Sequence, residues 1–329
     1  MAVAFVAWAL FVGTVAAQPN NPDGSTDSPV DSPDLFLVVL GIAQDAGYPQ
    51  AGCEKQCCQA VVQDPKRKRF VSSVAVVDRK NDERYVFDCT PDFREQLVLL
   101  NQTAAGKNEP DKNDKKKNAG LSGIFLTHAH IGHYTGLMHL GLEAMGTSDV
   151  PVYGMPRMKK FLSENGPWSQ LVKLGNIQLM DLADAKPVKF KRFSVTPFLV
   201  PHRDEFSETV GFRISSANKS IVYLPDIDKW SKWDQSIEKL VEGVDVALLD
   251  GSFFANGEIP GRDMSLIPHP FVTESITRFS SLDAEHRKRV KFIHLNHTNP
   301  ALQTDSAAAR QVKRAGMGIA GQGEIIDLN

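Results

Sequence analysis

The sequence predicts an α/β protein in which helices cover two β-sheets. Short apolar runs typical of strands dominate the chain, and helical segments lie between them. With 42% hydrophobic and 23% charged residues, a chain of 329 residues can bury a sizeable core. Helices packed on two sheets would bury both faces of each sheet. Neither an internal repeat nor an interdomain linker is evident, so we expect a single domain over residues 34–329.

The N-terminal segment is interpreted as an export signal with a disordered lead-in. Residues 2–17 are almost wholly apolar and end in small residues, which suits cleavage after Ala17. This run is shorter than the roughly 20 residues that cross a membrane. No Lys or Arg precedes it, which leaves an uncleaved anchor or a misplaced start as alternatives. Residues 18–33 are polar and proline-rich, as is typical of disorder. The prediction is a secreted or periplasmic protein without stable membrane association after signal cleavage.

Strands and helices alternate along the rest of the chain. Strands are predicted at 35–42, 70–77, 84–87, 123–126, 150–153, 193–200, 209–214, 220–224, 244–249 and 290–294, with the second and third forming a hairpin across the polar segment 78–82. Helices are predicted at 93–100, 134–145, 156–164, 233–240, 272–280 and 306–313. Pro156 is well tolerated at a first helical position.

Charge argues against a nucleic-acid partner. The formal net charge of -2 at pH 7 gives no general attraction to nucleic acid or to an anionic membrane. The charged run 107–118 favours a solvated loop over a phosphate-binding patch, because its charges partly cancel and no aromatic residue intervenes. The expected partner is a small-molecule substrate. The sequence predicts no particular oligomeric state.

Three of the nine histidines lie within six residues, directly after the strand predicted at 123–126. In an extended segment residues i and i+2 point to the same side, so His128 and His130 can converge on one ion. His133 lies where the chain turns back into the next helix. Neutral imidazole is a common ligand of zinc, iron and similar metals. This spacing favours a metal site over three solvated histidines.

Other potential ligands also follow predicted strands. His202 follows 193–200, Asp226 follows 220–224, and His294 ends 290–294. Each of them alone is typical of a hydrogen-bonded loop residue. Together they can provide nitrogen and carboxylate donors at the same end of several strands, as an open catalytic metal site requires.

This pattern resembles the signature of the metallo-β-lactamase superfamily, His-x-His-x-Asp-His after a strand. The chain is similar in particular to the pyrroloquinoline-quinone biosynthesis protein B family and to the cyclic phosphodiesterase of phosphonate breakdown. Residues 41–50 with Cys53 look like their opening, 90–93 like their post-strand turn, and 294–300 like their terminal histidine segment. The resemblance runs from about residue 35 to the C-terminus. It implies a four-layer αββα sandwich of the metallo-β-lactamase type.

The resemblance also implies a set of metal ligands. One metal would be held by His128, His130 and His202, and a second by His133 and His294, with Asp226 bridging the pair.

Gly132 departs from this signature, because it stands where the superfamily has Asp. The loss removes a ligand and a negative charge, so the second position is predicted to bind more weakly. Three possibilities stay open: a single-metal enzyme, a second metal completed by water or substrate, or a different metal such as iron. Asp204 and His269 are conceivable substitutes, although neither is indicated by spacing.

Cys53, Cys57 and Cys58 form a second cluster, and Cys89 stands apart. Disulfides are the usual interpretation in an exported protein. However, three cysteines cannot all pair with one another, and a bridge between adjacent cysteines is strained. A closed structural zinc is favoured, with His297 as fourth ligand, because its ring points away from that of the histidine three residues earlier. The phosphodiesterase resemblance implies the same arrangement, with a different cysteine spacing. Cys89 is predicted to be a buried free thiol.

The leading prediction is hydrolysis of an ester or phosphodiester bond through a metal-bound hydroxide. A metal at a three-histidine site lowers the pKa of its bound water toward about 7. The expected cofactors are one structural zinc and one or two catalytic zinc ions, with iron as the alternative catalytic metal. Asp226 would orient the metal and the water. His269 and the segment 250–252 are candidate proton donors to the leaving group, although a histidine between two prolines is as often a plain loop residue.

Two other functions remain open. The quinone-biosynthesis resemblance implies an iron- and oxygen-dependent hydroxylase, for which Gly132 would leave an open coordination position. Export argues mildly against it, because that biosynthetic precursor is made inside the cell. The third possibility is a non-catalytic, secreted metal-binding protein whose site has decayed.

Overall fold

The computed structural model describes residues 33–104 and 117–329. The predicted signal peptide (1–17), nearly all of the lead-in (18–33) and most of the charged run 107–118 lie outside these residues. Those three interpretations therefore stay predictions. Among the described residues no helix is both long and apolar enough to cross a membrane.

The first sheet has seven strands in the order β14-β1-β2-β3-β4-β5-β6. Their bounds are Leu35–Gly41 (β1), Ser73–Asp78 (β2), Glu83–Phe87 (β3), Gly123–Phe125 (β4), Val150–Gly154 (β5), Ile177–Asp181 (β6) and Ile325–Asp327 (β14). Pairing is antiparallel from β14 to β3 and parallel from β3 to β6. The hairpin predicted across 78–82 is present as β2 and β3.

The second sheet also has seven strands, in the order β13-β12-β11-β10-β9-β8-β7. Their bounds are Val188–Lys189 (β7), Phe193–Leu199 (β8), Val210–Ser216 (β9), Ser220–Leu224 (β10), Val246–Asp250 (β11), Val290–Ile293 (β12) and Gly318–Ile319 (β13). Pairing is antiparallel from β7 to β10 and parallel from β10 to β13.

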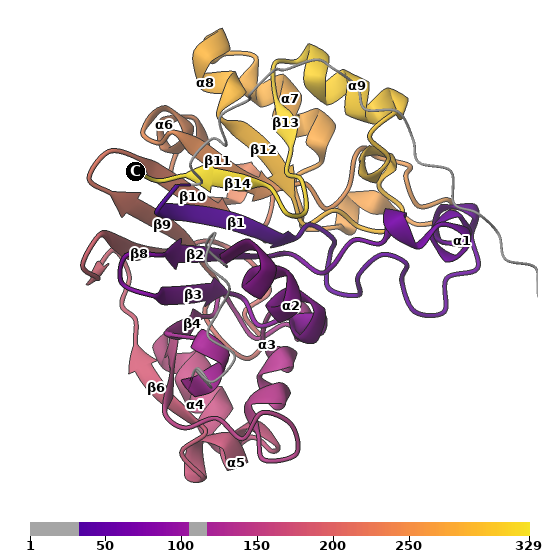
Figure 1. Cartoon of the computed structure of the whole chain (residues 1–329). Coiled ribbons are helices and arrows are strands. Elements are labelled where there is room, and N and C mark those ends of the chain that lie inside the picture. The colour runs from indigo at the N-terminus through magenta and orange to yellow at the C-terminus, as the bar shows by residue number, and fades with distance from the viewer. Residues whose placement is uncertain (1–32, 105–116) are drawn as a thin grey trace, which may run out of the picture. The chain divides into compact units, whose positions relative to one another are not determined.

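Helices flank the two sheets (Figure 1). They are Gln56–Gln63 (α1), Phe93–Ala104 (α2), Ile131–Tyr134 (α3), Pro156–Glu164 (α4), Trp168–Lys173 (α5), Ile237–Glu242 (α6), Val272–Phe279 (α7), Ala284–Lys288 (α8) and Ala307–Arg314 (α9). One apolar cluster joins the first sheet to α2, α4 and α5, and another joins the second sheet to α6, α7 and α9. The predicted four-layer αββα sandwich is confirmed.

Aromatic side chains dominate the core between the two sheets. The Phe87 and Phe125 rings stack with centroids 4.9 Å apart, and Phe212 from the second sheet meets Phe87 edge-on at 5.5 Å. All three side chains are fully buried. Large buried rings contribute strongly to core stability, so these contacts help to hold the two sheets against each other.

Two predicted helices differ from the structure. The segment 134–145 is not one α-helix: α3 ends at Tyr134 and a 3-10 helix, Thr135–Leu140, follows. Gly136 packs against the backbone at Thr90: a Cβ at residue 136 would lie 2.1 Å from the Thr90 carbonyl oxygen. This close packing overrides the helical pattern of the sequence. The helix predicted at 233–240 begins only at Ile237, because the Ser236 hydroxyl accepts the backbone N–H of Lys239 and caps it.

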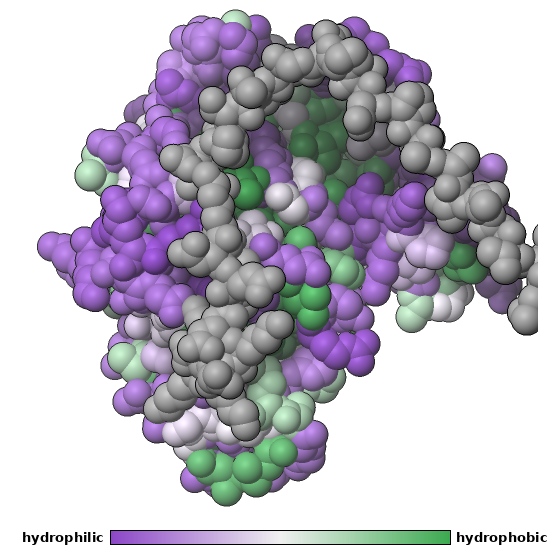
Figure 2. Space-filling model, in the orientation of Figure 1, coloured by the Kyte–Doolittle hydropathy of each residue, from purple (hydrophilic) through white to green (hydrophobic). Residues whose placement is uncertain are grey.

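The molecular face in Figure 2 is largely hydrophilic, and hydrophobic side chains are visible in its upper part and also at the end that carries α5. In that region Leu142 and Leu174 are more than half exposed. Exposed leucines are common on protein surfaces, so we assign these two no function.

Candidate metal centre

Asp88 anchors the histidine segment that follows β4. Its carboxylate accepts hydrogen bonds from the Thr127 backbone N–H and hydroxyl, both at 2.9 Å. It also accepts the Nδ1–H of His133 at 2.8 Å, which leaves Nε2 of that ring free to bind a cation. Asp88 has a φ of 66°, a conformation that non-glycine residues rarely adopt. Such strain is typical of functional sites that the surrounding structure holds in place.

The first donor group consists of His128, His130, His202 and Asp226, whose ligand atoms all lie within 4.8 Å of one another. Nε2 of His128 and Nε2 of His202 each lie 3.3 Å from Asp226 Oδ2. Two donors bound to one zinc ion at tetrahedral angles are about 3.3 Å apart, because each lies 2.0–2.2 Å from the ion. The spacing therefore fits a metal ion between these side chains.

The second donor group consists of Asp45, His133 and His294. Oδ1 of Asp45 lies 3.2 Å from Nε2 of His133 and 3.5 Å from Nε2 of His294. Oδ2 of Asp226 is 3.8 Å from the His133 nitrogen, so this carboxylate lies between the two groups. His294 adopts a φ of 64°, and its Nδ1 is 2.9 Å from the Ser252 hydroxyl. This contact directs Nε2 toward the centre.

Backbone pairing brings Asp45 beside His294. The Leu295 N–H donates to the Ile42 carbonyl at 2.8 Å, and the Gln44 N–H donates to the Leu295 carbonyl at 2.9 Å. The segment after β1 is thus bound to the segment after β12, and the side chains that follow both strands reach the same place.

Several buried polar atoms at this place have no hydrogen-bond partner. They are Asp45 Oδ1, His133 Nε2, His202 Nε2, Asp226 Oδ1 and His294 Nε2. An unsatisfied buried polar group costs about 1–3 kcal/mol, and native proteins contain few of them. Five such atoms around one point are accounted for if they are ligands of cations, so the residues present fit the metal that the sequence predicts.

His269 lies against the Asp226 carboxylate and is buried. Its Nδ1 is 2.8 Å from Asp250 Oδ2 and 3.1 Å from Asp226 Oδ1. Burial alone would lower its pKa, but the two carboxylates, Asp250 foremost, hold the pKa well above the ordinary value for histidine. The ring is therefore placed to hold a proton beside the metal ligands.

The structure shows residues of the metal centre that the sequence analysis missed, and it excludes one candidate ligand. Asp88 and Asp228 orient ligand histidines, the latter through His202 Nδ1 at 3.3 Å. Asp204 was a conceivable substitute for the missing signature carboxylate, and that idea is wrong. Its carboxylate accepts the Thr209 hydroxyl instead, and it is in neither donor group. Asp45 could have been noticed, since it also follows a predicted strand.

Burial and neighbouring charges shift the pKa values of the carboxylates and histidines in this centre. Burial alone would raise the pKa of Asp45, yet His133 and His294 hold it well below its usual range. For His202, burial acts to lower the pKa, but Asp226 and Asp228 raise it to about 9. Burial and the neighbouring His133 hold the pKa of His128 well below 6.5. Without metal, the centre thus combines carboxylates with some histidines whose pKa is raised, such as His202, and others whose pKa is lowered, such as His128.

Metal binding at this centre is expected to tighten as the pH rises from about 6 to 9. With a pKa of about 9, His202 carries a proton at neutral pH in the metal-free protein and must lose it before Nε2 binds an ion. Each proton released strengthens apparent affinity up to about tenfold per pH unit below that pKa. Calorimetric zinc titrations in buffers of different ionisation enthalpy measure the release, and His202→Ala should release fewer protons. An affinity that is constant over this range would contradict the expectation.

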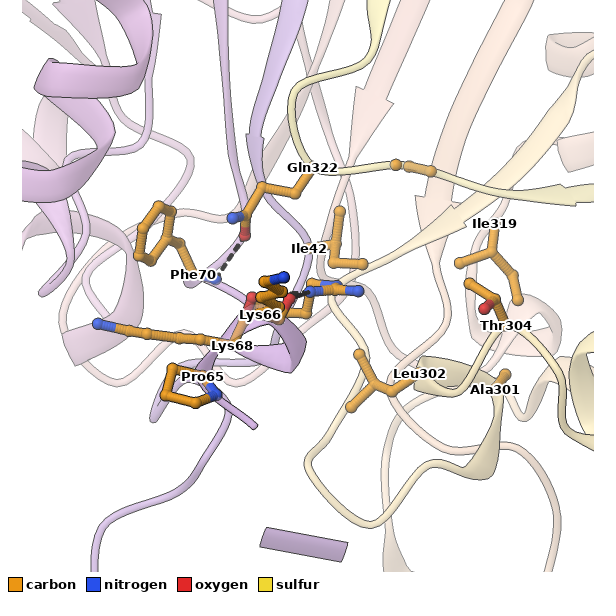
Figure 3. A pocket seen from close by; sticks show the side chains of 13 residues that line it. Ile42, Pro65, Lys66, Lys68, Phe70, Ala301, Leu302, Thr304, Ile319 and Gln322 are labelled. Carbon is orange, nitrogen blue, oxygen red and sulfur yellow. Dashed lines mark hydrogen bonds between the residues drawn. The ribbon is translucent and has the colours of Figure 1, made fainter. Parts of the chain in front are cut away.

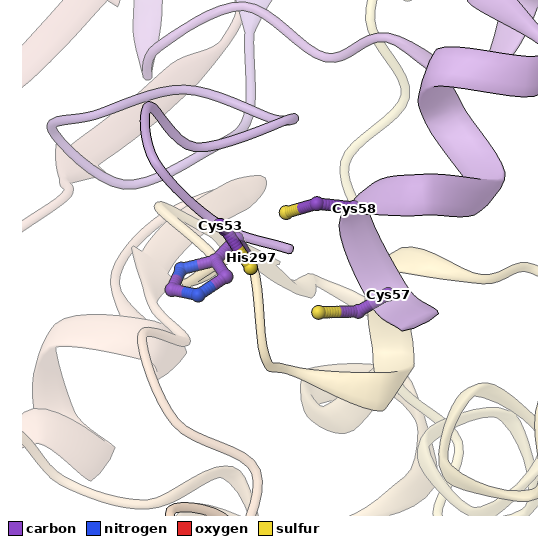
Figure 4. A group of neighbouring side chains, drawn as sticks. All are labelled: Cys53, Cys57, Cys58 and His297. Atoms are coloured by element: carbon purple, nitrogen blue, oxygen red, sulfur yellow. The ribbon is translucent and has the colours of Figure 1, made fainter. Parts of the chain in front are cut away.

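The cysteine cluster forms a separate candidate site. Cys53, Cys57 and Cys58 face His297, and the four ligand atoms lie within 4.8 Å of one another (Figure 4). All four cysteines of the chain are free, and Cys89 is buried as predicted. Three thiols and one imidazole are a common ligand set of closed structural zinc sites. A metal ion held by these four side chains would link the loop after β12, which carries His297, to the segment around α1.

Without a cation, the surroundings of two of the three thiols favour their neutral form. Burial raises the pKa of Cys58 to about 12, and the adjacent Cys53 contributes to the rise. Burial also raises the pKa of Cys57. Three thiolates this close together are unfavourable without positive charge, and a coordinated metal deprotonates such thiols outright.

A cavity of about 520 Å³ lies apart from both donor groups. Its lining includes Lys66, Lys68 and Arg69 as well as the apolar Phe70 and Leu302 (Figure 3). The Gln322 side chain accepts the Phe70 backbone N–H at 2.7 Å across its edge. None of the proposed metal ligands lines it.

Two seven-stranded sheets between helices, with histidine and carboxylate donors gathered at the strand ends, define the metallo-β-lactamase class of fold. A family model described as "Beta-lactamase superfamily domain" matches residues 83–311. The chain therefore belongs to this superfamily.

Known relatives resemble the chain over nearly its whole length. Coenzyme PQQ synthesis protein B of Methylorubrum extorquens is 25% identical over 320 residues, which cover 89% of this chain and 100% of the relative. Its counterpart in Acinetobacter baumannii is 22% identical over 321 residues, with the same coverage.

Solved structures share the fold. The zinc-bound PqqB from Methylobacterium extorquens matches with a TM-score of 0.74 and 22% identity, covering 89% of this chain and 100% of that one. A diphosphatase from the PhnP family matches with a TM-score of 0.59 and 21% identity, covering 89% and 96%.

Proposed function

We propose that the protein is a metal-dependent hydrolase that acts on an ester or phosphodiester bond of a small molecule. The observation that carries this proposal is the first donor group. In it, Nε2 of His128 and Nε2 of His202 each lie 3.3 Å from Asp226 Oδ2. Nε2 of His202 is buried and has no hydrogen-bond partner. When bound there, a metal supplies a Lewis acid and an activated water. Membership of the superfamily and the likeness to a PhnP-family diphosphatase agree with hydrolysis.

Residues of the chain would have different roles in this reaction. Asp226 lies between both donor groups and orients them. Asp88 and Asp228 hold the ligand rings of His133 and His202 in fixed orientations. His269 would hold a proton beside the reacting bond and donate it to the leaving group, as the raised pKa allows. Zinc is the proposed metal at the cysteine cluster and at one or two positions of the histidine centre.

Assays of the purified full chain test this function. After loading with zinc or manganese, the protein should hydrolyse a generic phosphodiester such as bis-p-nitrophenyl phosphate, or a p-nitrophenyl ester. Chelation should remove the activity, and added metal should restore it. Metal-loaded protein that turns over neither class of substrate would overturn the proposal.

Replacing His269 by Ala is expected to lower kcat by about 10²–10⁴-fold for substrates with a poor leaving group. Because an activated phenolate leaves without protonation, p-nitrophenyl substrates should lose much less. Metal content should stay unchanged. His286→Ala is the matched control, since that histidine lies in the surface helix α8 and pairs with Asp283. Equal losses for both kinds of leaving group would refute the role of proton donor.

A second candidate is an iron- and oxygen-dependent hydroxylase, favoured by the whole-length similarity to coenzyme PQQ synthesis protein B. Metal analysis separates the two functions. Iron with oxygen uptake and without esterase activity would replace the hydrolase proposal. Metal found only at the cysteine cluster, and unchanged by His128→Ala, would instead favour a non-catalytic metal-binding protein.

A further inference from the structure

The second donor group contains a carboxylate from an unexpected part of the chain. The superfamily signature places an Asp directly before His133, where this sequence has Gly132. The structure nevertheless has a carboxylate beside His133, that of Asp45 from the loop after β1. Its Oδ1 is buried, lacks a hydrogen bond and faces two histidine nitrogens that also lack one.

Gly132 and Asp45 compete for one space. A Cβ built at Gly132 would lie 2.2 Å from Asp45 Oδ1 and 2.5 Å from Asp45 Cα. No heavy atoms tolerate such approaches without movement of the backbone. The backbone conformation of residue 132 does not require glycine, since its φ is not positive. Glycine is required because the Asp45 loop occupies the volume of the missing side chain.

We infer that Asp45 is the ligand that completes the second metal position, in place of the signature aspartate that Gly132 lacks. The carboxylate comes from the loop after β1, and its oxygen lies 3.2 Å from Nε2 of His133. The charge of the centre is kept, because Asp45 and Asp226 together supply two carboxylates. The centre then binds two metals, and the prediction of a weakened second position is replaced.

This inference rests on the metal centre of the proposed function but not on its reaction. It also removes the open coordination position that Gly132 implied, because the Asp45 carboxylate fills it. The Gln44 N–H donates to the Leu295 carbonyl at 2.9 Å, which fixes the backbone next to Asp45.

Metal content and zinc affinity of the full chain test the inference. In Asp45→Ala, the zinc content should fall by one equivalent, and affinity for that ion should weaken by at least about 100-fold, since even residues that only support a ligand cost 10–100-fold. Asp204→Ala is the matched control, because that carboxylate is nearby in sequence to His202 but in neither donor group. It should keep the full zinc content.

Gly132→Ala gives an independent test. The added methyl group should displace Asp45 and cause the same loss of one zinc equivalent, although no ligand is changed. If this variant does not fold, Asp45→Asn decides, because it keeps the shape and removes the charge. Full zinc content and unchanged affinity in Asp45→Ala or Asp45→Asn would overturn the inference. If the wild-type histidine centre binds no metal, both the inference and the proposed function fail. If the centre binds its metals but the protein has no hydrolase activity, only the proposed function fails.

Discussion

Replacing Asp226 by Ala should abolish hydrolysis, with kcat/KM lower by at least about 10³-fold, and should strip metal from the histidine centre. Asp226 is almost fully buried, and its carboxylate reaches His128, His202 and His269 within 3.3 Å. Without it, the rings lose the negative charge that offsets a dication, and the two donor groups lose their shared oxygen. Removing one partner of a buried charge network typically costs 3–5 kcal/mol.

Metal content and activity must be measured together for this variant. Asp234→Ala is the control, since Asp234 is an exposed carboxylate elsewhere on the second half of the chain. The control should keep both the metal and the activity. If Asp226→Ala retained metal at the histidine centre and hydrolysed substrate within tenfold of the wild-type rate, Asp226 would not be the bridging ligand.

Replacing Cys58 by Ser should remove one zinc equivalent and destabilise the protein by several kcal/mol, because structural zinc sites contribute folding free energy directly. For a domain of this size that loss corresponds to a fall in Tm of roughly 5–8 °C. Cys58 is fully buried, and its Sγ accepts the Gln50 backbone N–H at 3.4 Å. The loop from residue 43 to residue 72 has only α1 and one 3-10 helix as regular structure, so a zinc ion would add a link to His297 beyond the backbone pairing of Tyr48 with Arg69.

Cys89→Ala is the matched control for the zinc count. Cys89 is equally buried but packs in the cluster between the first sheet and α2. It should lose stability through packing and keep all of its zinc. Melting curves with and without a chelator separate the effects, since chelation should lower the Tm of Cys89→Ala but change that of Cys58→Ser much less. A full zinc content in Cys58→Ser would contradict the structural site.

Much of the fold was predictable because its signals are local. The apolar runs of β1, β8, β10 and β12 mark strands with no need for tertiary information. The position of His202, Asp226 and His294 directly after such strands predicted that they converge, because neighbouring strands end at a common edge. The structure brings these donors together. The helix expected at 134–145 was wrong because close packing of Gly136 on Thr90 cannot be read from periodicity.

The sequence by itself therefore determined ten of the fourteen strands in the described residues and the histidine pattern, since each depends on residues adjacent in the chain or on one repeated rule. The short strands β6, β7, β13 and β14 were not predicted, and the αββα class came from the family resemblance. Only the tertiary structure decided that Asp45 fills the place of the side chain missing at Gly132 and that Asp88 and Asp250 orient the centre. Those facts depend on which loops pair across the ends of the sheets. Loop pairing is fixed by strand order and register, and no spacing within the sequence encodes it.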